Sequence, residues 1–338
     1  MFKREGVVAL YGEHKQTLKS LVLLGDELKQ RFYGIDDAID AMILSVAAGE
    51  ALLLIGPPGT AKSSLVRAFC RRIGLIDKNS AALGAKERPY FEYLLTQFTE
   101  PGELFGFYNL AALSKATPVL ERLDAGMMQH ARVVFLDEVF NASSAILNSL
   151  LAFMNERKFH DRGSVVPVRL EYLVGATNDI PTSPELRAFF DRFLLRAWVR
   201  SVAPEREEVR NLLNAAWRET HSPPTADLSF DNLLEQLKDF RSLIDKLTKA
   251  GKLVIDLEHA FAGHLADCIS FVRSTSHSEM SNRRLVGFAK IILVQALLRA
   301  ARDDNREPAI ELNDVRVLLK FGVDRQSEEL DRQFVQVA

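Results

Sequence analysis

The sequence Ala51-Leu-Leu-Leu-Ile-Gly-Pro-Pro-Gly-Thr-Ala-Lys-Ser63 joins an apolar run to a turn that contains two glycines. Residues 51–55 are apolar without alternation, which predicts a strand buried on both faces, as in a parallel sheet. Residues 64–72 then combine apolar side chains and arginines at helical spacing. The stretch therefore predicts a strand, a sharp turn and a helix, and it places the chain in the α/β class.

The turn follows the pattern Gly-x-x-x-x-Gly-Lys-[Ser/Thr] with one departure, Ala61 in place of the second glycine. In this pattern backbone N–H groups cradle phosphate oxygens, Lys62 reaches the β- and γ-phosphates, and the Ser63 hydroxyl binds Mg²⁺. We expect the turn to accept Ala61 only if this residue does not need a positive φ. A tight turn with a surface lysine is the alternative. The candidate phosphate-binding residues are Gly56, Pro57, Pro58, Gly59, Thr60, Ala61, Lys62, Ser63 and Ser64.

Composition excludes several classes of protein. The chain has 338 residues, 47% of them hydrophobic, and a formal net charge of −2, which predicts no general attraction to nucleic acid. Cys70 and Cys268 lack metal-ligand spacing, which favours small core residues in a reducing compartment, and we expect a cytoplasmic protein. The chain begins with polar helix, and Gln295 interrupts its longest apolar stretch, so no membrane insertion is predicted.

A second apolar run, residues 133–136, predicts another buried strand, and two carboxylates follow it directly. Adjacent side chains at a strand end point in different directions, so the two acids can serve different roles. Asp137 is placed to hold Mg²⁺, and Glu138 to orient and deprotonate the water that attacks a γ-phosphate. A solvated strand end is the alternative, but the phosphate-binding turn upstream favours the catalytic interpretation.

A third polar candidate follows the next strand. Residues 143–156 predict a helix, residues 157–169 a hairpin, and residues 170–176 a buried strand. Asn178 comes just after that strand, where an uncharged amide can hydrogen-bond the attacking water or the γ-phosphate. Taken alone, Asn178 is equally well explained as a turn residue.

Arg192 ends a short helix predicted over residues 184–192. A planar guanidinium in an exposed position can neutralise the charge that spreads over a transferring phosphoryl group, as an arginine finger does. Asp191 could instead pair with it. Arg187 is the second candidate for the finger.

Residues 106–128 follow a strand predicted over residues 89–95 and show no regular period, which favours an inserted loop or hairpin. We place Phe107, Tyr108 and Leu110 near its tip and expect them to contact a partner, because aromatic residues outside any period rarely serve an internal core. Packing against the insert itself is the alternative.

The order of these motifs resembles the AAA+ ATPases, and their details resemble the MoxR family, especially its regulatory-ATPase-variant or RavA-like branch. That family tolerates alanine before the lysine, as in Gly56-Pro-Pro-Gly-Thr-Ala-Lys-Ser63. The resemblance is strong over residues 15–200 and weak beyond them. Other matching stretches are Val134-Phe-Leu-Asp-Glu138, Ala145-Ile-Leu-Asn-Ser-Leu-Leu151, Asn155-Glu-Arg-Lys-Phe159 and Ala176-Thr-Asn178.

This resemblance implies an enzyme that binds ATP and ADP, hydrolyses ATP with Mg²⁺, and remodels or activates a protein partner as a hexameric, chaperone-like ring. It makes Asn178 the sensor 1 residue and Arg192 a finger given in trans. The segment 106–128 corresponds to the helix-2 insert, and 157–169 to the pre-sensor-1 hairpin. The partner often carries a von Willebrand factor A (vWA) domain. RavA-like proteins also have a partner-binding module beyond the lid, whose contacts are not carried over to these residues.

Beyond residue 200 the sequence becomes helical, which predicts an all-α lid over residues 201–338 after an α/β core over residues 1–200. Ser281-Asn-Arg-Arg284 resembles the sensor 2 motif of AAA+ lids, with Arg283 reaching the nucleotide. Arg284 is the neighbouring alternative, and both could instead be surface charges at a helix start. We expect Asn313 to cap a short last helix through Lys320.

Two other functional classes share these parts. A nucleic-acid motor or an activator of sigma-54 transcription would have the same ATPase motifs. Those activators carry Gly-Ala-Phe-Thr-Gly-Ala in the insert, where this chain has Phe107-Tyr-Asn-Leu-Ala-Ala112, and no helix-turn-helix pattern or basic aromatic patch is present. A non-hydrolysing scaffold is disfavoured by Lys62, Asp137, Glu138 and Asn178 together.

Overall fold

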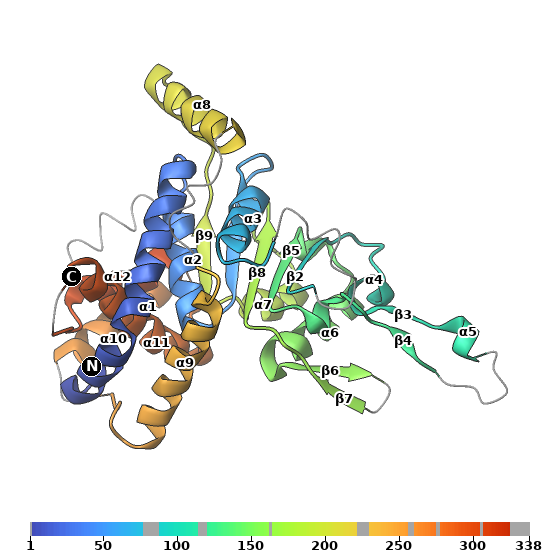
Figure 1. The fold of residues 1–338 in the computed structure, drawn as a ribbon. Helices are drawn as coiled ribbons and strands as arrows, with labels where there is room; N and C mark the ends of the chain where they lie inside the picture. Colours follow the sequence, from blue (N-terminus) through green and yellow to red (C-terminus); the bar gives the residue numbers. More distant parts are fainter. Residues whose placement is uncertain are drawn as a thin grey trace.

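A five-stranded parallel sheet forms the centre of the computed structural model (Figure 1). The strand order is β2-β5-β8-β1-β9. The strand before the phosphate-binding turn, β1, therefore lies between β8 and β9, the two strands of this sheet that come last in the sequence. The structure describes residues 2–76, 88–113, 120–161, 164–221, 230–255, 260–274, 278–304 and 307–324. The strands are β1 Leu52–Ile55, β2 Tyr90–Leu94, β5 Val133–Asp137, β8 Tyr172–Thr177 and β9 Leu195–Trp198.

The sheet separates two hydrophobic cores, which explains the unbroken apolar runs in the sequence. Successive side chains of a strand point to opposite faces. In β1, Leu52 and Leu54 join the core beside the N-terminal and C-terminal helices, whereas Leu53 and Ile55 join the other core. The strand β5 divides in the same way. The residues of β1 and residues 133–136 of β5 are therefore buried on one face or the other, as predicted for a parallel sheet.

Helices cover both faces of this sheet. One face packs against α1 Arg4–Arg31, α2 Asp36–Ala48 and α3 Lys62–Arg72. The other face packs against α4 Pro101–Phe105, α6 Ser144–Glu156 and α7 Pro184–Phe190. Helix α6 begins after Ser143, whose hydroxyl caps the helix by accepting a hydrogen bond from the Ile146 N–H.

The C-terminal part of the described chain is helical. Helix α1 packs along α11 and α9, so the first helix of the chain is part of this helical assembly as well as of the core over the sheet. Glu311 caps α12 in a capping box with Asp314, which corrects the expectation that Asn313 is the cap. The helices are α8 Arg206–His221, α9 Leu233–Lys249, α10 Ala260–Ser274, α11 Asn282–Arg302 and α12 Leu312–Phe321.

Two hairpins extend from the core. The insert contains β3 Phe107–Tyr108 and β4 Arg122–Leu123, an antiparallel pair, with α5 Leu110–Leu113 beyond them. A short 3-10 helix, η1 Met128–His130, ends the segment, and another, η2 Val139–Asn141, follows β5. The second hairpin pairs β6 Lys158–Asp161 with β7 Ser164–Pro167, as predicted.

Contacts of Tyr108 and Arg122 fasten the insert at its base. The Tyr108 hydroxyl donates to Asp161 Oδ1 at 3.0 Å, and Arg122 Nη2 donates to the same hydroxyl at 2.6 Å. The expectation that Phe107 and Tyr108 lie near the tip is therefore wrong, because β3 begins directly after α4. Leu110 does lie farther out, on α5, and is 73% exposed. Among the described residues, no helix is long and apolar enough to cross a membrane.

Candidate active site

The phosphate-binding turn lies at the edge of the sheet where the parallel strands end. Gly56 follows β1 and donates its N–H to the Thr177 carbonyl of β8 at 3.1 Å. A Cβ at position 56 would stand 2.0 Å from the Val199 carbonyl oxygen, so only glycine fits between these strands. Gly59 takes a φ of 80°, which glycine adopts at no steric cost. The turn then enters α3, whose N-terminus is a favourable place for an anion.

Ala61 also adopts the left-handed conformation, with a φ of 64° and a ψ of 16°. The expectation that this turn accepts alanine only where no positive φ is needed is therefore wrong. The backbone keeps the shape that the usual glycine would take, and alanine adopts it at a conformational cost. The Ala61 side chain is exposed, so its methyl group points into solvent and not into the packed core.

Lys62 is held inside the turn. Its ammonium group donates to the Gly56 carbonyl at 2.6 Å and to the Pro57 carbonyl at 2.9 Å, and it lies 3.5 Å from Asn178 Oδ1. The side chain is 7% exposed. Burial lowers the pKa of Lys62, although the nearby carboxylates of Asp137 and Glu138 favour the charged form. A lysine in this position presents its charge to whatever anion the turn binds.

The two oxygen ligands proposed for Mg²⁺ lie side by side. The Ser63 hydroxyl, in the first turn of α3, donates to Asp137 Oδ2 at 3.1 Å. Asp137 ends β5, and its other oxygen accepts the Glu138 N–H at 3.0 Å. Mg²⁺ is commonly held by one or two protein oxygens together with phosphates and water. This pair of donors, next to the turn, fits that coordination without a larger cluster of acids.

Glu138 and Asn178 come together from neighbouring strands β5 and β8. The Asn178 amide donates to Glu138 Oε1 at 2.5 Å, and Asn141 lies 3.4 Å from the other carboxylate oxygen. Burial raises the pKa of Glu138, and the charge of Asp137 raises it further. Glu138 also has a φ of 52°, a strained conformation for a residue with a Cβ, and it directs the carboxylate toward Asn178.

The structure thus brings together five residues proposed from sequence: Lys62, Ser63, Asp137, Glu138 and Asn178. They converge because parallel strands end at one edge of a sheet. Asn141 was missed, and nothing in the sequence distinguishes it from another turn residue. It reaches Glu138 because the 3-10 helix η2 turns it back toward the strand end.

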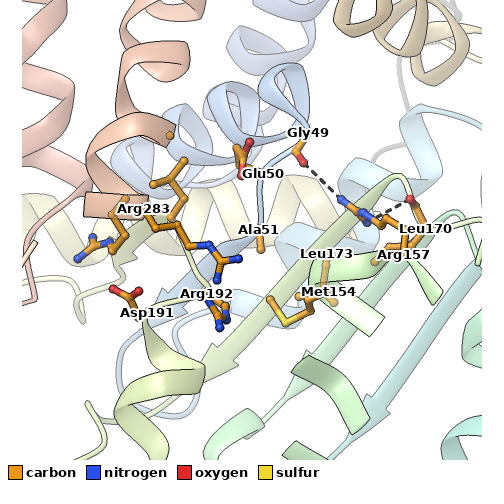
Figure 2. A pocket seen from close by; sticks show the side chains of 13 residues that line it. Gly49, Glu50, Ala51, Met154, Arg157, Leu170, Leu173, Asp191, Arg192 and Arg283 are labelled. Atoms are coloured by element: carbon orange, nitrogen blue, oxygen red, sulfur yellow. Dashed lines mark hydrogen bonds between the residues drawn. The ribbon is translucent and has the colours of Figure 1, made fainter. Parts of the chain in front are cut away.

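Arg192 and Arg283 lie at the opposite edge of the sheet, in a cavity of about 210 Å³ (Figure 2). Gly49, Glu50 and Ala51, which precede β1, line the same cavity. The strand β1 separates Ala51 from Gly56, and five residue steps of about 3.3 Å each place them about 16 Å apart. Arg283 of one chain therefore does not reach that chain's own phosphate-binding turn, which corrects the expectation drawn from its position in the lid.

The same cavity contains Arg157, which sequence analysis did not single out. It follows α6 and donates to the Leu170 carbonyl at 3.1 Å and to the Gly49 carbonyl at 3.4 Å. Burial lowers the pKa of Arg157. Arg192 Nε is buried without a hydrogen-bond partner among the described residues. The cavity is thus lined by four arginines, Arg284 being the fourth, and by two carboxylates, Glu50 and Asp191, an excess of positive charge.

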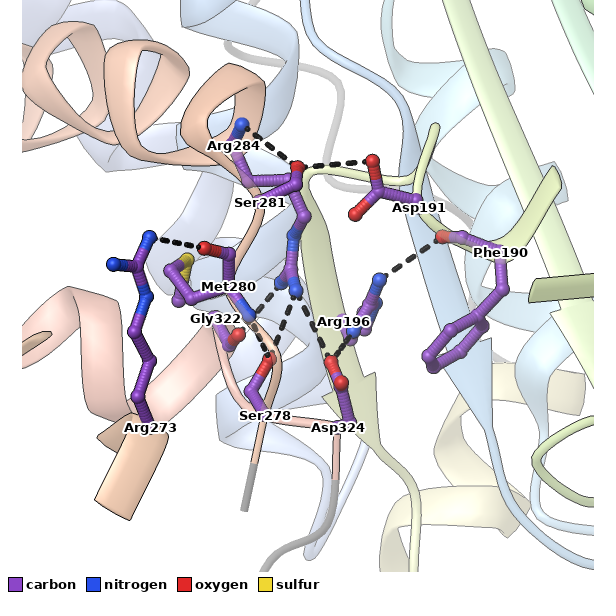
Figure 3. A network of polar contacts seen from close by, with 10 residues as sticks. All are labelled: Phe190, Asp191, Arg196, Arg273, Ser278, Met280, Ser281, Arg284, Gly322 and Asp324. Carbon is purple, nitrogen blue, oxygen red and sulfur yellow. Dashed lines mark hydrogen bonds and ion pairs between the residues drawn. The ribbon is translucent and has the colours of Figure 1, made fainter. Parts of the chain in front are cut away.

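Arg284 belongs to a separate, buried network (Figure 3). It is 2% exposed and donates to the Gly322 carbonyl at 2.6 Å and to Asp324 at 3.0 Å. Asp324 also pairs with Arg196 of β9, which is 1% exposed. Burial lowers the pKa of Arg284 to about 10. Arg284 also lines the cavity of Arg192, but both of its terminal nitrogens donate within this network.

A hydroxyl links this network to the cavity. Ser281 caps α11 by accepting the Arg284 N–H at 3.3 Å, and it donates to Asp191 Oδ2 at 3.0 Å. Asp191 precedes Arg192, so the start of α11 and the end of α7 are held together. Arg187, the second candidate for the finger, instead pairs with Glu279 at 3.1 Å, and both side chains are exposed.

The fold, together with the phosphate-binding turn and the residues at the neighbouring strand ends, is that of an AAA+ ATPase. A family model for the "MoxR domain in the MoxR-vWA-beta-propeller ternary systems" matches residues 18–239. The chain therefore belongs to the MoxR family of AAA+ ATPases.

Curated relatives agree with this assignment. An uncharacterised protein of Methanocaldococcus jannaschii is 32% identical over 303 residues, which cover 90% of this chain and 70% of the relative. A second uncharacterised protein of that organism is 39% identical over 177 residues, or 52% of this chain and 44% of the relative. A structural protein of Acidianus two-tailed virus is 24% identical over 259 residues, which cover 75% of this chain and 40% of the viral protein.

A solved structure supports the fold. A crystal structure of a proposed ATPase from Cytophaga hutchinsonii superposes with a TM-score of 0.62 and 14% sequence identity. The match covers 97% of this chain and 94% of that chain. At this identity the similarity concerns the arrangement of sheet and helices.

Proposed function

We propose that this chain hydrolyses ATP with Mg²⁺ and uses the cycle, as a subunit of a ring, to remodel or activate a protein partner. The observation that carries the proposal is the contact between Glu138 and Asn178 beside Lys62 and the Ser63–Asp137 pair. A base, an amide, a lysine and a pair of oxygen ligands at one edge of a parallel sheet are the parts that γ-phosphoryl transfer to water requires.

In this proposal each residue of the site has its own role in ATP binding or hydrolysis. Binding of the phosphates to the turn exchanges the bonds of Lys62 to the Gly56 and Pro57 carbonyls for bonds to phosphate oxygens. Glu138 accepts the proton of the attacking water, and Asn178 holds that carboxylate or the water in line. When bound by Ser63 and Asp137, Mg²⁺ supplies charge neutralisation at the phosphates. A raised pKa makes Glu138 a stronger base than an exposed glutamate.

The positions of Arg192 and Arg283 support an active site completed by a second subunit. Both side chains lie at the edge of the sheet opposite the phosphate-binding turn, so neither serves its own chain's nucleotide. In a head-to-tail ring this edge faces the turn of the next copy. Arg192 is then the arginine finger in trans, Arg283 lies beside it, and we propose a hexamer as the closed form.

The partner is proposed from the family and the insert. The matching family model is named for systems that combine MoxR with a vWA protein and a β-propeller, so we propose a vWA-domain partner. Phe107 and Leu110 of the insert are 53% and 73% exposed and offer a contact surface. The RavA-like branch remains a hypothesis based on the quoted motifs. A cytoplasmic location stays part of the proposal, with Cys70 and Cys268 both free and buried.

Two substitutions test the hydrolytic site. Lys62→Ala should abolish ATP binding, because it removes the cation of the turn, whereas Glu138→Gln should retain binding and lose hydrolysis. Binding is measured with a fluorescent ATP analogue and hydrolysis by phosphate release. Asn141→Ala, at a longer distance from the same carboxylate, is the matched control and should lose much less activity. Near-normal turnover in Glu138→Gln would exclude Glu138 as the base.

A further inference from the structure

Helix α8 is fastened to the body by its polar side. The Tyr33 hydroxyl, just after α1, donates to Glu208 Oε2 at 3.0 Å, and Asn211 Nδ2 donates to that hydroxyl at 3.3 Å. Figure 1 shows the helix standing away from the rest of the molecule. From Arg206 to Trp217, where burial is described, no residue of α8 is buried. An amphipathic helix of a globular protein normally does the reverse and packs its apolar side on the core.

The apolar side of α8 points outward as a continuous stripe. Val209, Leu212 and Leu213 are 40%, 37% and 63% exposed, and Trp217 continues the stripe at 68%. Their spacing of three and four residues places them on one face of the helix. Isolated helices of this length are only marginally stable in water, so the exposed stripe indicates a surface that is covered in the working protein.

The position of α8 places its stripe beside the phosphate-binding turn. The chain leaves β9 at Val199, whose N–H donates to the Ile55 carbonyl at 2.7 Å, next to the phosphate-binding turn. Helix α8 begins a few residues later and is therefore carried on the edge of the sheet that, in the proposed ring, meets the next copy. The surface that faces it there is the edge with Arg192 and Arg283.

That opposite edge offers an apolar contact. Val286 lies three residues after Arg283 on α11 and is 75% exposed, although most of α11 is buried. Residues three apart lie on one side of a helix, so Val286 lies on the same side of α11 as Arg283, which lines the cavity. The apolar stripe of α8 and the exposed Val286 lie on opposite edges of one chain. This is the arrangement that a heterologous, ring-forming interface requires.

We propose that the apolar stripe of α8 docks on a second copy of this chain, against the start of α11 around Val286, and so helps to bring that copy's Arg192 to the ATP site. This inference rests on the proposed ring and adds the surface that holds it together. It also explains why the exposed stripe of α8 lies beside the edge of the sheet that carries the phosphate-binding turn.

Assembly of charged variants tests the inference. In a Glu138→Gln background with ATP, Leu213→Glu should raise the protein concentration for half-assembly by about tenfold or more, because a charge replaces a leucine that the proposed interface buries. Asn214→Glu, at the next position and about 100° from Leu213 around the helix, is the matched control and should impair assembly far less. Assembly is measured by sedimentation velocity, with ATP binding and helical circular dichroism as checks on folding.

The outcomes separate the two proposals. If the parent protein does not assemble with ATP, the ring itself is refuted and this inference with it. If the parent assembles and Leu213→Glu matches Asn214→Glu, the ring stands and the docking surface is wrong. The same conclusion follows if Leu213→Glu assembles normally but no longer binds a vWA partner.

Cross-linking locates the contact. Leu213→Cys combined with Val286→Cys should form disulfides between copies on mild oxidation, and Asn214→Cys with Val286→Cys should form far fewer. The native Cys70 and Cys268 are buried and add little background. Equal cross-linking of the two pairs would overturn the assignment of Val286 as the contact.

Discussion

Replacement of Ala61 by glycine tests the conformation of the phosphate-binding turn. Ala61 holds a φ of 64° with an exposed side chain, so the substitution removes a backbone penalty and no packing. A residue with a Cβ pays about 1–2 kcal/mol in this conformation. Glycine in turn costs about 0.4–1 kcal/mol through the greater freedom of the unfolded chain. Ala61→Gly should therefore stabilise the protein by about 0.5–1 kcal/mol.

The chain offers matched controls within the same turn. Gly59 has a φ of 80°, and a Cβ added there meets no atom of the described residues within 4 Å, so Gly59→Ala should destabilise by a similar amount without a clash. A Cβ at Gly56 would lie 2.0 Å from the Val199 carbonyl oxygen, so Gly56→Ala should be much more damaging. Equilibrium urea unfolding without nucleotide measures all three. If Ala61→Gly is neutral or destabilising while Gly59→Ala is destabilising, the left-handed assignment of Ala61 is refuted.

Three further predictions concern acid–base behaviour, the insert and the lid. The acid limb of the pH profile of kcat/KM should lie above the usual glutamate range, because Glu138 must be deprotonated and its pKa is raised. Asn178→Ala removes a hydrogen bond that lowers this pKa. The residual activity of that variant should therefore show its acid limb at still higher pH. An unshifted limb would argue against Glu138. Phe107→Ala should leave basal ATPase activity intact and weaken partner-stimulated turnover, whereas Tyr108→Ala should also destabilise the insert; equal unfolding of both variants would make Phe107 structural. Ser281→Ala should lower the unfolding free energy by about 1–2 kcal/mol in urea, since it removes both a helix cap and a bond to Asp191, and no loss would contradict that role.

The sheet and the convergence of the candidate site residues could be predicted because their causes are local. An apolar run without alternation indicates a strand covered on both faces, and β1, β5 and β8 are buried in this way. Parallel strands end at one edge, so Lys62, Asp137 and Asn178 had to converge. The contact of Lys62 with Asn178 and that of Ser63 with Asp137 follow from this convergence of strand ends.

Other features depend on how distant segments pack, and the sequence did not reveal them. Arg283 was expected near the chain's own nucleotide, but the packing of α11 places it with Arg192 at the other edge of the sheet. Tyr108 looked like a residue of a loop tip, and only its contact with Asp161, a residue of the other hairpin, shows that it anchors the insert.

The sequence also did not indicate the local backbone conformation at several positions. Ala61 and Glu138 both adopt positive φ, and neither residue type signals this, since glycine or asparagine would be the usual choice. The cap of α12 was misplaced by two residues, because Glu311 and Asp314 form a reciprocal capping box that a search for the single asparagine overlooks.

A subunit-mixing experiment tests the central claim, that one chain supplies the hydrolytic residues and the next supplies Arg192. Arg192→Ala subunits retain Glu138, and Glu138→Gln subunits retain Arg192. In random equal mixtures about a quarter of the interfaces combine both intact halves, so ATPase activity should rise well above that of either variant alone. Exchange of subunits is confirmed with differently labelled chains. If the mixed assemblies stay as inactive as the separate variants, the arginine finger is not Arg192 in trans, and the account of a shared active site is contradicted.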